Sequence, residues 1–404
     1  MKKIISILIL IYMLILVFYG LIIKFTLSNP LLFKIKTIVP EFILLSIIVI
    51  SFMYVITYKK FKFKDKNLIC IVVYLIGLVF MNIFTSPSFS GIMYTVRDLI
   101  LPILTMYLLI QIDFNEKEIR YIIKSIISIL TVFIIVGCLL SCVQQIKGWE
   151  WSAKFYTNYA FYGLDPISKV KIWDAHGLLR TPSVTGNSVT FGFYSLVSYI
   201  LIKNSDMKLI PKIILLSMSI ISMIMSTSKT VLVILVVLAI LEVISKFNKY
   251  SKVSILIFMS TITSIIFAYI VQEDPGLIKS TFERFEIWKD TLIVLNPINL
   301  VVPLSLFTLN SSAEGFLSFL DNTYLYFGYA TGIIGLILII RYILNLIAKY
   351  KHNRSALELL ITFILASSFL NITQGRAYFA IFCIFIPIVI KSIDINNKYN
   401  KEHI

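Results

Sequence analysis

The sequence predicts an all-α, polytopic membrane protein, and three observations support that prediction. Hydrophobic residues make up 58% of the 404 positions. Charged residues make up only 14%, against roughly 25% in soluble domains. Mean hydropathy is +0.91, and the apolar stretches run unbroken for about 17 to 25 residues, the length of a membrane-spanning helix. Because these stretches lack a period of two, an outer-membrane β-barrel is excluded.

Twelve apolar segments are expected to cross the bilayer. The first follows Lys2 and Lys3 and lacks a small-residue cleavage site, so we expect it to be a retained span. In chain order the segments are about 4–23, 38–57, 68–85, 92–111, 121–143, 185–203, 210–227, 230–246, 253–271, 323–345, 356–372 and 377–393. Residues 1–404 are therefore predicted to form a single integral membrane domain.

The basic residues predict which way the spans face. The net charge is +16, and most of the 37 lysines and arginines lie in short segments between spans. We predict that both termini are cytoplasmic, because Lys59 to Lys66 and Lys203 then fall on the inner side, as the positive-inside rule requires. Two long loops, 144–184 and 272–322, are then external, and they hold all four tryptophans. Tryptophans there suit either interfacial anchoring or packing in a sugar-facing cleft.

Several function classes lack their sequence signatures. The chain has no Walker A segment, no G-x-G-x-x-G and no H-E-x-x-H. No span carries a carboxylate near its centre, which argues against a proton-coupled transporter. The positive charge is scattered between spans, so no nucleic-acid partner is expected. The cysteines, which we expect to be buried small hydrophobes and not metal ligands, are Cys70, Cys138, Cys142 and Cys383.

The clearest polar pattern runs from Arg180 to Asn187, where the first external loop meets the next span. Pro182 and Gly186 predict a turn, and Thr185 and Asn187 can cap exposed backbone N–H groups. An arginine beside the free N–H groups of a helix start is suited to binding a phosphate anion. The alternative is an arginine that snorkels to the membrane surface.

Other polar residues are predicted on the same outer side. Ser228 and Lys229 put a cation in a very short external loop, where the lysine binds an anion or simply reaches the lipid head groups. Arg284 and Trp288 would share one face of a helix, which also suits an amphipathic helix lying on the bilayer. Asp321 precedes a span, where an aspartate commonly caps the helix. Further candidates on the outer side are Arg97, Asn322, Tyr324 and Arg376.

These stretches resemble motifs of the O-antigen polymerase and O-antigen ligase family, the Wzy-type membrane glycosyltransferases. R-x-P-x-x-x-G-N before a span resembles residues 180–187, and a Ser-Arg or Ser-Lys pair that opens a span resembles 228–229. The family's N-x-Y-L, followed by G-I-I-G, resembles 322–335, and F-x-x-W in the largest loop resembles 285–288. The similarity covers roughly residues 90 to 345.

Two positions depart from the family pattern. Lys229 stands where the family usually has arginine, so a bidentate contact to phosphate is lost there. Asp321 stands where the ligase branch often has a histidine with a catalytic role. The second departure favours a repeat-unit polymerase over a ligase.

The resemblance implies an enzyme at the outer face of the cytoplasmic membrane that joins repeat units of a surface polysaccharide, such as O-antigen, capsule or exopolysaccharide. The donor would be a glycan on polyprenyl pyrophosphate, and no metal or cofactor is expected. Arg180 and Arg284 would stabilise the departing pyrophosphate, and Asp321 would be the general base. Asp174, Glu283, Asp290 and His176 are reserve candidates for the base. The residues expected to bind the pyrophosphate or the sugars are Lys229, Asn187, Arg97, Trp288, Asn322, Tyr324 and Arg376.

The sequence also fits two functions other than a polymerase. A flippase or transporter of lipid-linked oligosaccharides also suits twelve spans and cationic sites, although two long outer loops argue against it. A ligase would use the same chemistry on another acceptor. In a polymerase pathway the expected partners are the bilayer, the lipid-linked oligosaccharide, a flippase and a chain-length regulator.

Overall fold

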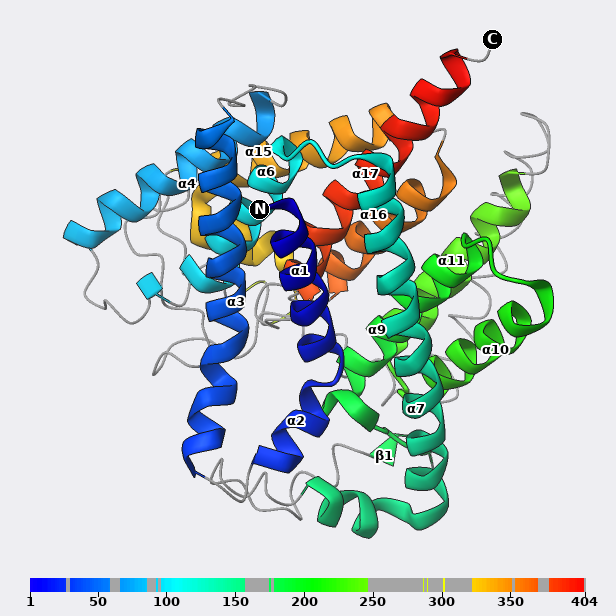
Figure 1. The fold of residues 1–404 in the computed structure, drawn as a ribbon. Helices are drawn as coiled ribbons and strands as arrows, with labels where there is room; N and C mark the ends of the chain where they lie inside the picture. Colours follow the sequence, from blue (N-terminus) through cyan, green and yellow to red (C-terminus); the bar gives the residue numbers. More distant parts are fainter. Residues whose placement is uncertain are drawn as a thin grey trace.

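The computed structural model of the chain is a bundle of helices with one two-stranded ribbon (Figure 1). It describes residues 1–26, 30–58, 66–85, 92–93, 96–156, 174–175, 178–245, 286, 289, 301, 322–350, 353–369 and 378–402. The predicted span 253–271 lies outside these residues, as does nearly all of the second predicted external loop.

Helices make up nearly all of the described secondary structure. The α-helices are α1 Lys2–Val17, α2 Tyr19–Thr26, α3 Pro30–Thr57, α4 Lys66–Thr85, α6 Leu101–Gln111, α7 Glu116–Tyr156, α9 Ser188–Lys203, α10 Leu209–Met225, α11 Lys229–Ser245, α15 Thr323–Tyr350, α16 Arg354–Phe369 and α17 Tyr378–Glu402. A π-helix, η1 Val96–Ile100, a 3₁₀-helix, η3 Ser183–Thr185, and the strands β1 Asp174–Ala175 and β2 Leu178–Leu179 complete the described elements.

Four of the described helices are long and apolar enough to cross a membrane. Their spans are Ile38–Thr57, Lys66–Phe84, Glu116–Gly148 and Ala330–Tyr350. The pair α1 and α2 meets the same test when its two helices are taken together. Shorter apolar helices are Ser188–Lys203, Leu209–Met225 and Phe379–Ser392. The prediction of a helical membrane protein is thereby confirmed. Eleven of the twelve predicted segments overlap described helices, but the count of twelve spans stays a prediction.

The first predicted external loop begins with helix. α7 continues to Tyr156, and its apolar span extends to Gly148 instead of ending at residue 143. Gly148 breaks the helix with a φ of 75° and a ψ of −176°, a conformation that glycine adopts because it has no Cβ. The loop boundary at residue 144 stays a prediction, because the length of a helix does not fix the point at which it leaves a membrane.

The first predicted span, 4–23, is bent. α1 and α2 meet at an angle of 73° at Phe18. α2 then lies directly against η3, since a Cβ on Gly20 would meet backbone atoms of Thr185 and Gly186. The absence of a side chain at Gly20 thus allows two backbones to approach closely.

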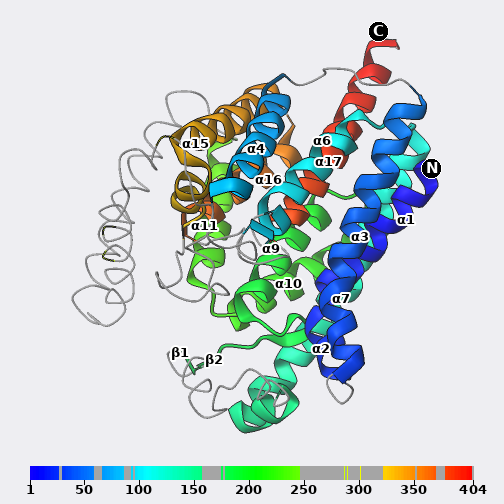
Figure 2. The ribbon, with the colours of Figure 1, turned by 90° about the vertical axis from the view of Figure 1, so that its left-hand side faces the viewer.

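α9 and the first half of α17 lie in the core of the bundle. Most residues from Phe191 to Ile202 are buried, as are most from Phe379 to Ile390. Phe133 of α7 packs on Phe191 with ring centres 5.8 Å apart, and the aromatic contacts continue from α9 into α17. Edge-on aromatic pairs at this distance are favourable beyond the apolar area that they bury. Figure 2 shows the helices of the bundle leaning across one another around this core.

One end of the bundle, which we call the terminus end, is the end nearer to both chain termini (upper part of Figures 1 and 2, with the C-terminus at the top and the N-terminus lower). There, Lys2 Nζ lies 3.6 Å from Glu118 Oε2. Lys391 Nζ lies 5.4 Å from the ring centre of Phe114 in the turn between α6 and α7. These residues are predicted on the inner side of the membrane, and the structure gathers them at one end.

The other end, which we call the loop end, is where α9 begins. The N–H of Ser183 bonds to the Gln144 side chain, and Tyr194, farther along the chain, packs on Phe133 with ring centres 6.1 Å apart. As the chain advances from 183 to 194, its contacts on α7 therefore move back from 144 to 133. α9 therefore runs back along α7 toward the terminus end. Lys203, its last residue, lies at the terminus end, and Asn187 lies at the loop end.

Gly20→Ala is expected to destabilise the protein, because the added methyl group would overlap backbone atoms of Thr185 and Gly186. Overpacking of this kind costs about 1–3 kcal/mol, so the melting temperature of the purified protein in detergent should fall. Gly77→Ala in α4 is the matched control, since nothing lies within 4 Å of its added Cβ. Equal melting temperatures for the two variants would contradict the close approach of α2 and η3.

Candidate functional site

The chain before Arg180 is anchored to α7. The Gln145 side-chain amide donates to the Leu179 carbonyl at 2.6 Å and accepts from the Leu179 N–H at 3.3 Å. β2 also pairs with β1, with Asp174 opposite Leu179. Asp174, a reserve candidate for the base, is therefore close to Arg180 along the ribbon.

Buried hydroxyl groups anchor the chain after Arg180. The Thr181 N–H and hydroxyl both donate to the Met225 carbonyl at the end of α10, at 3.1 and 2.9 Å. The Ser183 hydroxyl donates to the Gly137 carbonyl at 2.7 Å, and the Ser183 N–H donates to Gln144 at 3.2 Å. Thr181 and Ser183 are fully buried, so these bonds satisfy polar groups that have no access to water.

Arg180 itself is half-buried and is followed at once by the predicted turn. The Gly186 N–H donates to the Pro182 carbonyl at 3.1 Å, and Gly186 has a φ of 75°. Glycine favours this left-handed conformation because it has no Cβ. The predicted turn between Pro182 and Gly186 is confirmed, and it brings Arg180 close to the start of α9.

Asn187 caps α9, as predicted. Its side-chain oxygen accepts a hydrogen bond from the Thr190 N–H at 3.1 Å, and the Thr185 hydroxyl oxygen accepts from the Asn187 N–H at 3.4 Å. The start of an α-helix carries a partial positive charge from its N–H groups. Arg180 and the start of α9 therefore both contribute positive potential to the loop end.

Lys229 begins α11 beside this segment. The preceding turn contains Thr227, with a φ of 48°, and the Ser228 N–H donates to the Ser226 hydroxyl at 3.3 Å. Ser226 packs against α9, because a Cβ on Gly192 would meet its side chain. Lys229 is exposed. The two predicted cations, far apart in the sequence, thus lie on neighbouring segments.

Asn322 and Tyr324 tie the start of α15 to the end of α16. The Asn322 side-chain oxygen accepts from the Leu325 N–H at 3.1 Å, and its amide nitrogen donates to the Ser368 carbonyl at 3.1 Å. The Tyr324 hydroxyl donates to the Ile364 carbonyl at 3.3 Å. Asn322, the residue after Asp321, therefore caps the start of α15.

Arg97 forms an ion pair with its neighbour in η1. Its Nε and Nη2 atoms donate to the two carboxylate oxygens of Asp98 at 2.6 and 2.8 Å. Asp98 is buried, and such forked pairs are strong. Val96 packs with Leu325 and Tyr326 in a small apolar cluster, so η1 lies beside the start of α15. The Asp98 carboxylate balances the charge of Arg97.

The starts of α9 and α15 both lie next to the start of α17. Phe193 of α9 packs on Phe382 at 5.6 Å between ring centres, and Phe327 of α15 packs on Phe379 at 5.7 Å. α11 also begins next to α9, and α15 is linked to α9 through α17.

Four predicted site residues, Asp321, Arg284, Trp288 and Arg376, lie outside the described residues. Among the others, the structure brings Arg180, Asn187 and Lys229 onto adjacent segments. It holds Asn322 and Tyr324 against α16 and pairs Arg97 with Asp98.

The predicted site residues did not include three polar residues of α7 that hold the chain on both sides of Arg180. Ser141, Gln144 and Gln145 all bond to the segment 179–183. Their spacing of three and four residues puts them on one helix face at the end of an apolar run. Polar residues on one face at the end of an apolar run indicate that another polar segment of the chain packs against that face.

The chain matches no protein-family model and no curated protein sequence.

Asn322→Ser and Asn322→Ala are expected to separate the two bonds of Asn322. Serine keeps a cap acceptor but loses the bond to Ser368, which should cost about 1 kcal/mol of unfolding free energy. Alanine loses both bonds and should cost about 2 kcal/mol. Unfolding of the purified protein in detergent measures both values. If Asn322→Ser is as stable as the wild type, the bond to Ser368 contributes nothing.

Proposed function

We propose that the protein is a repeat-unit polymerase of a surface polysaccharide and belongs with the O-antigen polymerases and ligases. The observation that carries the proposal is the loop end itself. There, Arg180 and Lys229 lie on adjacent segments beside the starts of α9 and α11. Fixed cations and helix N-termini are suited to holding a diphosphate.

The proposed reaction transfers a glycan from polyprenyl pyrophosphate to a sugar hydroxyl of a second lipid-linked repeat unit. The hydroxyl oxygen bonds to the anomeric carbon as the bond from that carbon to the pyrophosphate oxygen breaks. The hydroxyl proton passes to a carboxylate, for which Asp321 is the first candidate. The pyrophosphate leaves on its polyprenol, and its negative charge is stabilised by Arg180, Lys229 and Arg284.

The remaining predicted residues have supporting roles in this proposal. Asn187 and Asn322 keep the starts of α9 and α15 in place through their caps. Tyr324 and Trp288 offer aromatic surface and a hydroxyl to sugars, and Arg376 adds a further cation. In this proposal Arg97 has a structural role: it pairs with Asp98 in η1, which lies beside the start of α15.

The proposed location is the cytoplasmic membrane, with the loop end outside and the terminus end inside. This orientation agrees with the positive-inside rule, because Lys2, Lys203 and Lys391 belong to the terminus end. Lipid-linked repeat units would then reach the loop end after a flippase has moved them across the bilayer. A chain-length regulator is the other expected partner.

Deleting the gene tests the proposal. We expect the mutant to display single repeat units on its surface and to lack the ladder of long chains on a gel. Loss of the attachment of otherwise complete chains would identify a ligase instead. Lipid-linked repeats trapped on the cytoplasmic face would identify a flippase.

Arg180→Ala is expected to abolish long chains in the complemented deletion strain, because the departing diphosphate loses a fixed cation. Arg180→Lys keeps the charge but loses the forked donors, so it should retain part of the polymer. Arg120→Ala removes an exposed arginine of α7 that is paired with Glu116 and serves as the matched control. Normal ladders from Arg180→Ala at normal expression would remove Arg180 from the mechanism.

Asp321→Asn is expected to be inactive, since an amide cannot accept the hydroxyl proton. Asp206→Asn is the matched control, because it removes an exposed carboxylate between α9 and α10, away from the proposed site. A near wild-type polymer yield from Asp321→Asn would transfer the role of base to another carboxylate, with Asp174 tested next.

A further inference from the structure

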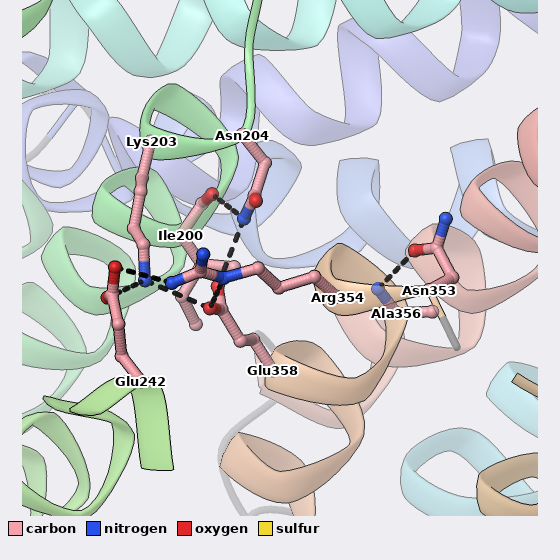
Figure 3. Close-up of polar contacts among 8 residues, drawn as sticks. All are labelled: Ile200, Lys203, Asn204, Glu242, Asn353, Arg354, Ala356 and Glu358. Atoms are coloured by element: carbon pink, nitrogen blue, oxygen red, sulfur yellow. Dashed lines mark hydrogen bonds and ion pairs between the residues drawn. The ribbon is translucent and has the colours of Figure 1, made fainter. Parts of the chain in front are cut away.

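A cluster of paired charges lies at the terminus end, far from the proposed site. Lys203 Nζ lies 2.7 Å from Glu242 Oε2 and 2.9 Å from Glu358 Oε1 (Figure 3). Arg354 contacts the same two carboxylates, with its Nε 3.0 Å from Glu358 Oε1 and its Nη2 bonded to Glu242. We call these four residues the charge cluster. Each cation bridges both carboxylates.

Amide groups complete the hydrogen bonding around the charge cluster. The Asn204 amide donates to Glu358 Oε2 at 3.0 Å and to the Ile200 carbonyl at 2.8 Å. Asn353 caps α16 by accepting from the Ala356 N–H at 2.9 Å. Glu358 therefore has partners on both oxygens, and the end of α9 is bonded to the start of α16.

The charge cluster is shielded from water on one side and open on the other, since the side chains of Glu242 and Arg354 are 30% and 49% exposed. The side chains of Lys203 and Glu358 are 15% and 10% exposed. Two cations and two carboxylates balance, whereas removal of one would leave a desolvated charge without its partner. Hydrogen bonds to Glu242 and Glu358 also raise the pKa of Arg354.

The three helices that meet in the charge cluster are those whose other ends form the proposed site. α9 ends in the cluster at Lys203 and begins at the Asn187 cap. α11 passes through it at Glu242 and begins at Lys229. α16 begins at Arg354 and ends beside the Ser368 carbonyl, which accepts from Asn322. Each of these helices is about 24 Å long.

We propose that the charge cluster positions the catalytic end of the protein, with Lys203 as a positioning residue that fixes the mutual tilt of α9, α11 and α16. A helix that pivots by 5° about one end moves its other end by about 2 Å over this length. A misplacement of about 1 Å at a reacting centre can lower a rate about a hundredfold. Loss of one charge at the terminus end would therefore displace Asn187, Lys229 and Asn322 together.

The catalytic part of this inference rests on the proposed function, but its geometric part does not. Spin labels at Val189 of α9 and Val233 of α11 report the distance between the two helices near the loop end, without altering a proposed site residue. The four cysteines, all free in the structure, are first replaced by alanine. Full-length protein in lipid nanodiscs is measured, and the same variants without labels are tested for polymer ladders in cells.

Lys203→Met is expected to broaden the distribution of label distances and to lower polymer yield about tenfold or more. Lys203→Arg should restore both, because a guanidinium can bridge the same two carboxylates. Lys208→Met is the matched control, since Lys208 is an exposed lysine at the same end. A narrow, unshifted distribution in Lys203→Met would overturn the proposal.

Glu242→Gln is the second variant in case Lys203→Met fails to accumulate. It keeps the pair of Lys203 with Glu358 and weakens only the attachment of α11, so the distance from α9 to α11 should still broaden. An unchanged distance would overturn the proposal. If the distances respond as expected but the deletion strain makes normal polymer, the proposed function fails and the geometric inference stands.

Discussion

A backbone amide that leaves the helical pattern inside a protein has no water to bond, so a buried irregular segment must find its partners within the protein. The loop end obeys this constraint through buried side-chain hydroxyls and amides. Thr181 and Ser183 bond to carbonyls of α10 and α7, and Gln144 and Gln145 bond to the returning chain. The position of Arg180 follows from these bonds, because the residues on both sides of it are fixed.

The two ends of the bundle use charge in different ways. At the terminus end, Lys203 and Arg354 are neutralised by two carboxylates, and the result is a connection between helices. At the loop end, Arg180 and Lys229 lie beside the starts of α9 and α11, which carry the positive ends of the helix dipoles. The terminus end therefore connects helices through ion pairs, and the proposed function assigns anion binding to the loop end.

The sequence predicts the helices and the local caps well. Apolar runs locate the helices because their length and composition leave no other structure in a membrane. The turn at Pro182 and Gly186 and the Asn187 cap are local features that depend on residue types a few positions apart. The predicted site residues with strong local signals, Arg180 and Lys229, are also those that the structure brings together.

Other features could not be predicted from the sequence, because they depend mainly on contacts between residues far apart in the chain. The bend at Phe18 accompanies the close approach of Gly20 to η3, and the part of α7 past residue 143 bonds through Gln145 to Leu179. The Arg97–Asp98 pair is a local feature, but two adjacent opposite charges do not by themselves predict a forked ion pair. The charge cluster joins residues from three helices, and only the spacing of Arg354 and Glu358 hints at it.

The central claim is that the loop end faces the exterior and the terminus end faces the cytoplasm. Single cysteines at positions 229 and 208, in a background without the native cysteines, test it with a membrane-impermeant thiol reagent on intact cells. The account predicts that the cysteine at 229 reacts from the medium and that the cysteine at 208 reacts only after the cells are opened. The reverse pattern would contradict it, because lipid-linked sugars outside the cell could not then reach Arg180 and Lys229.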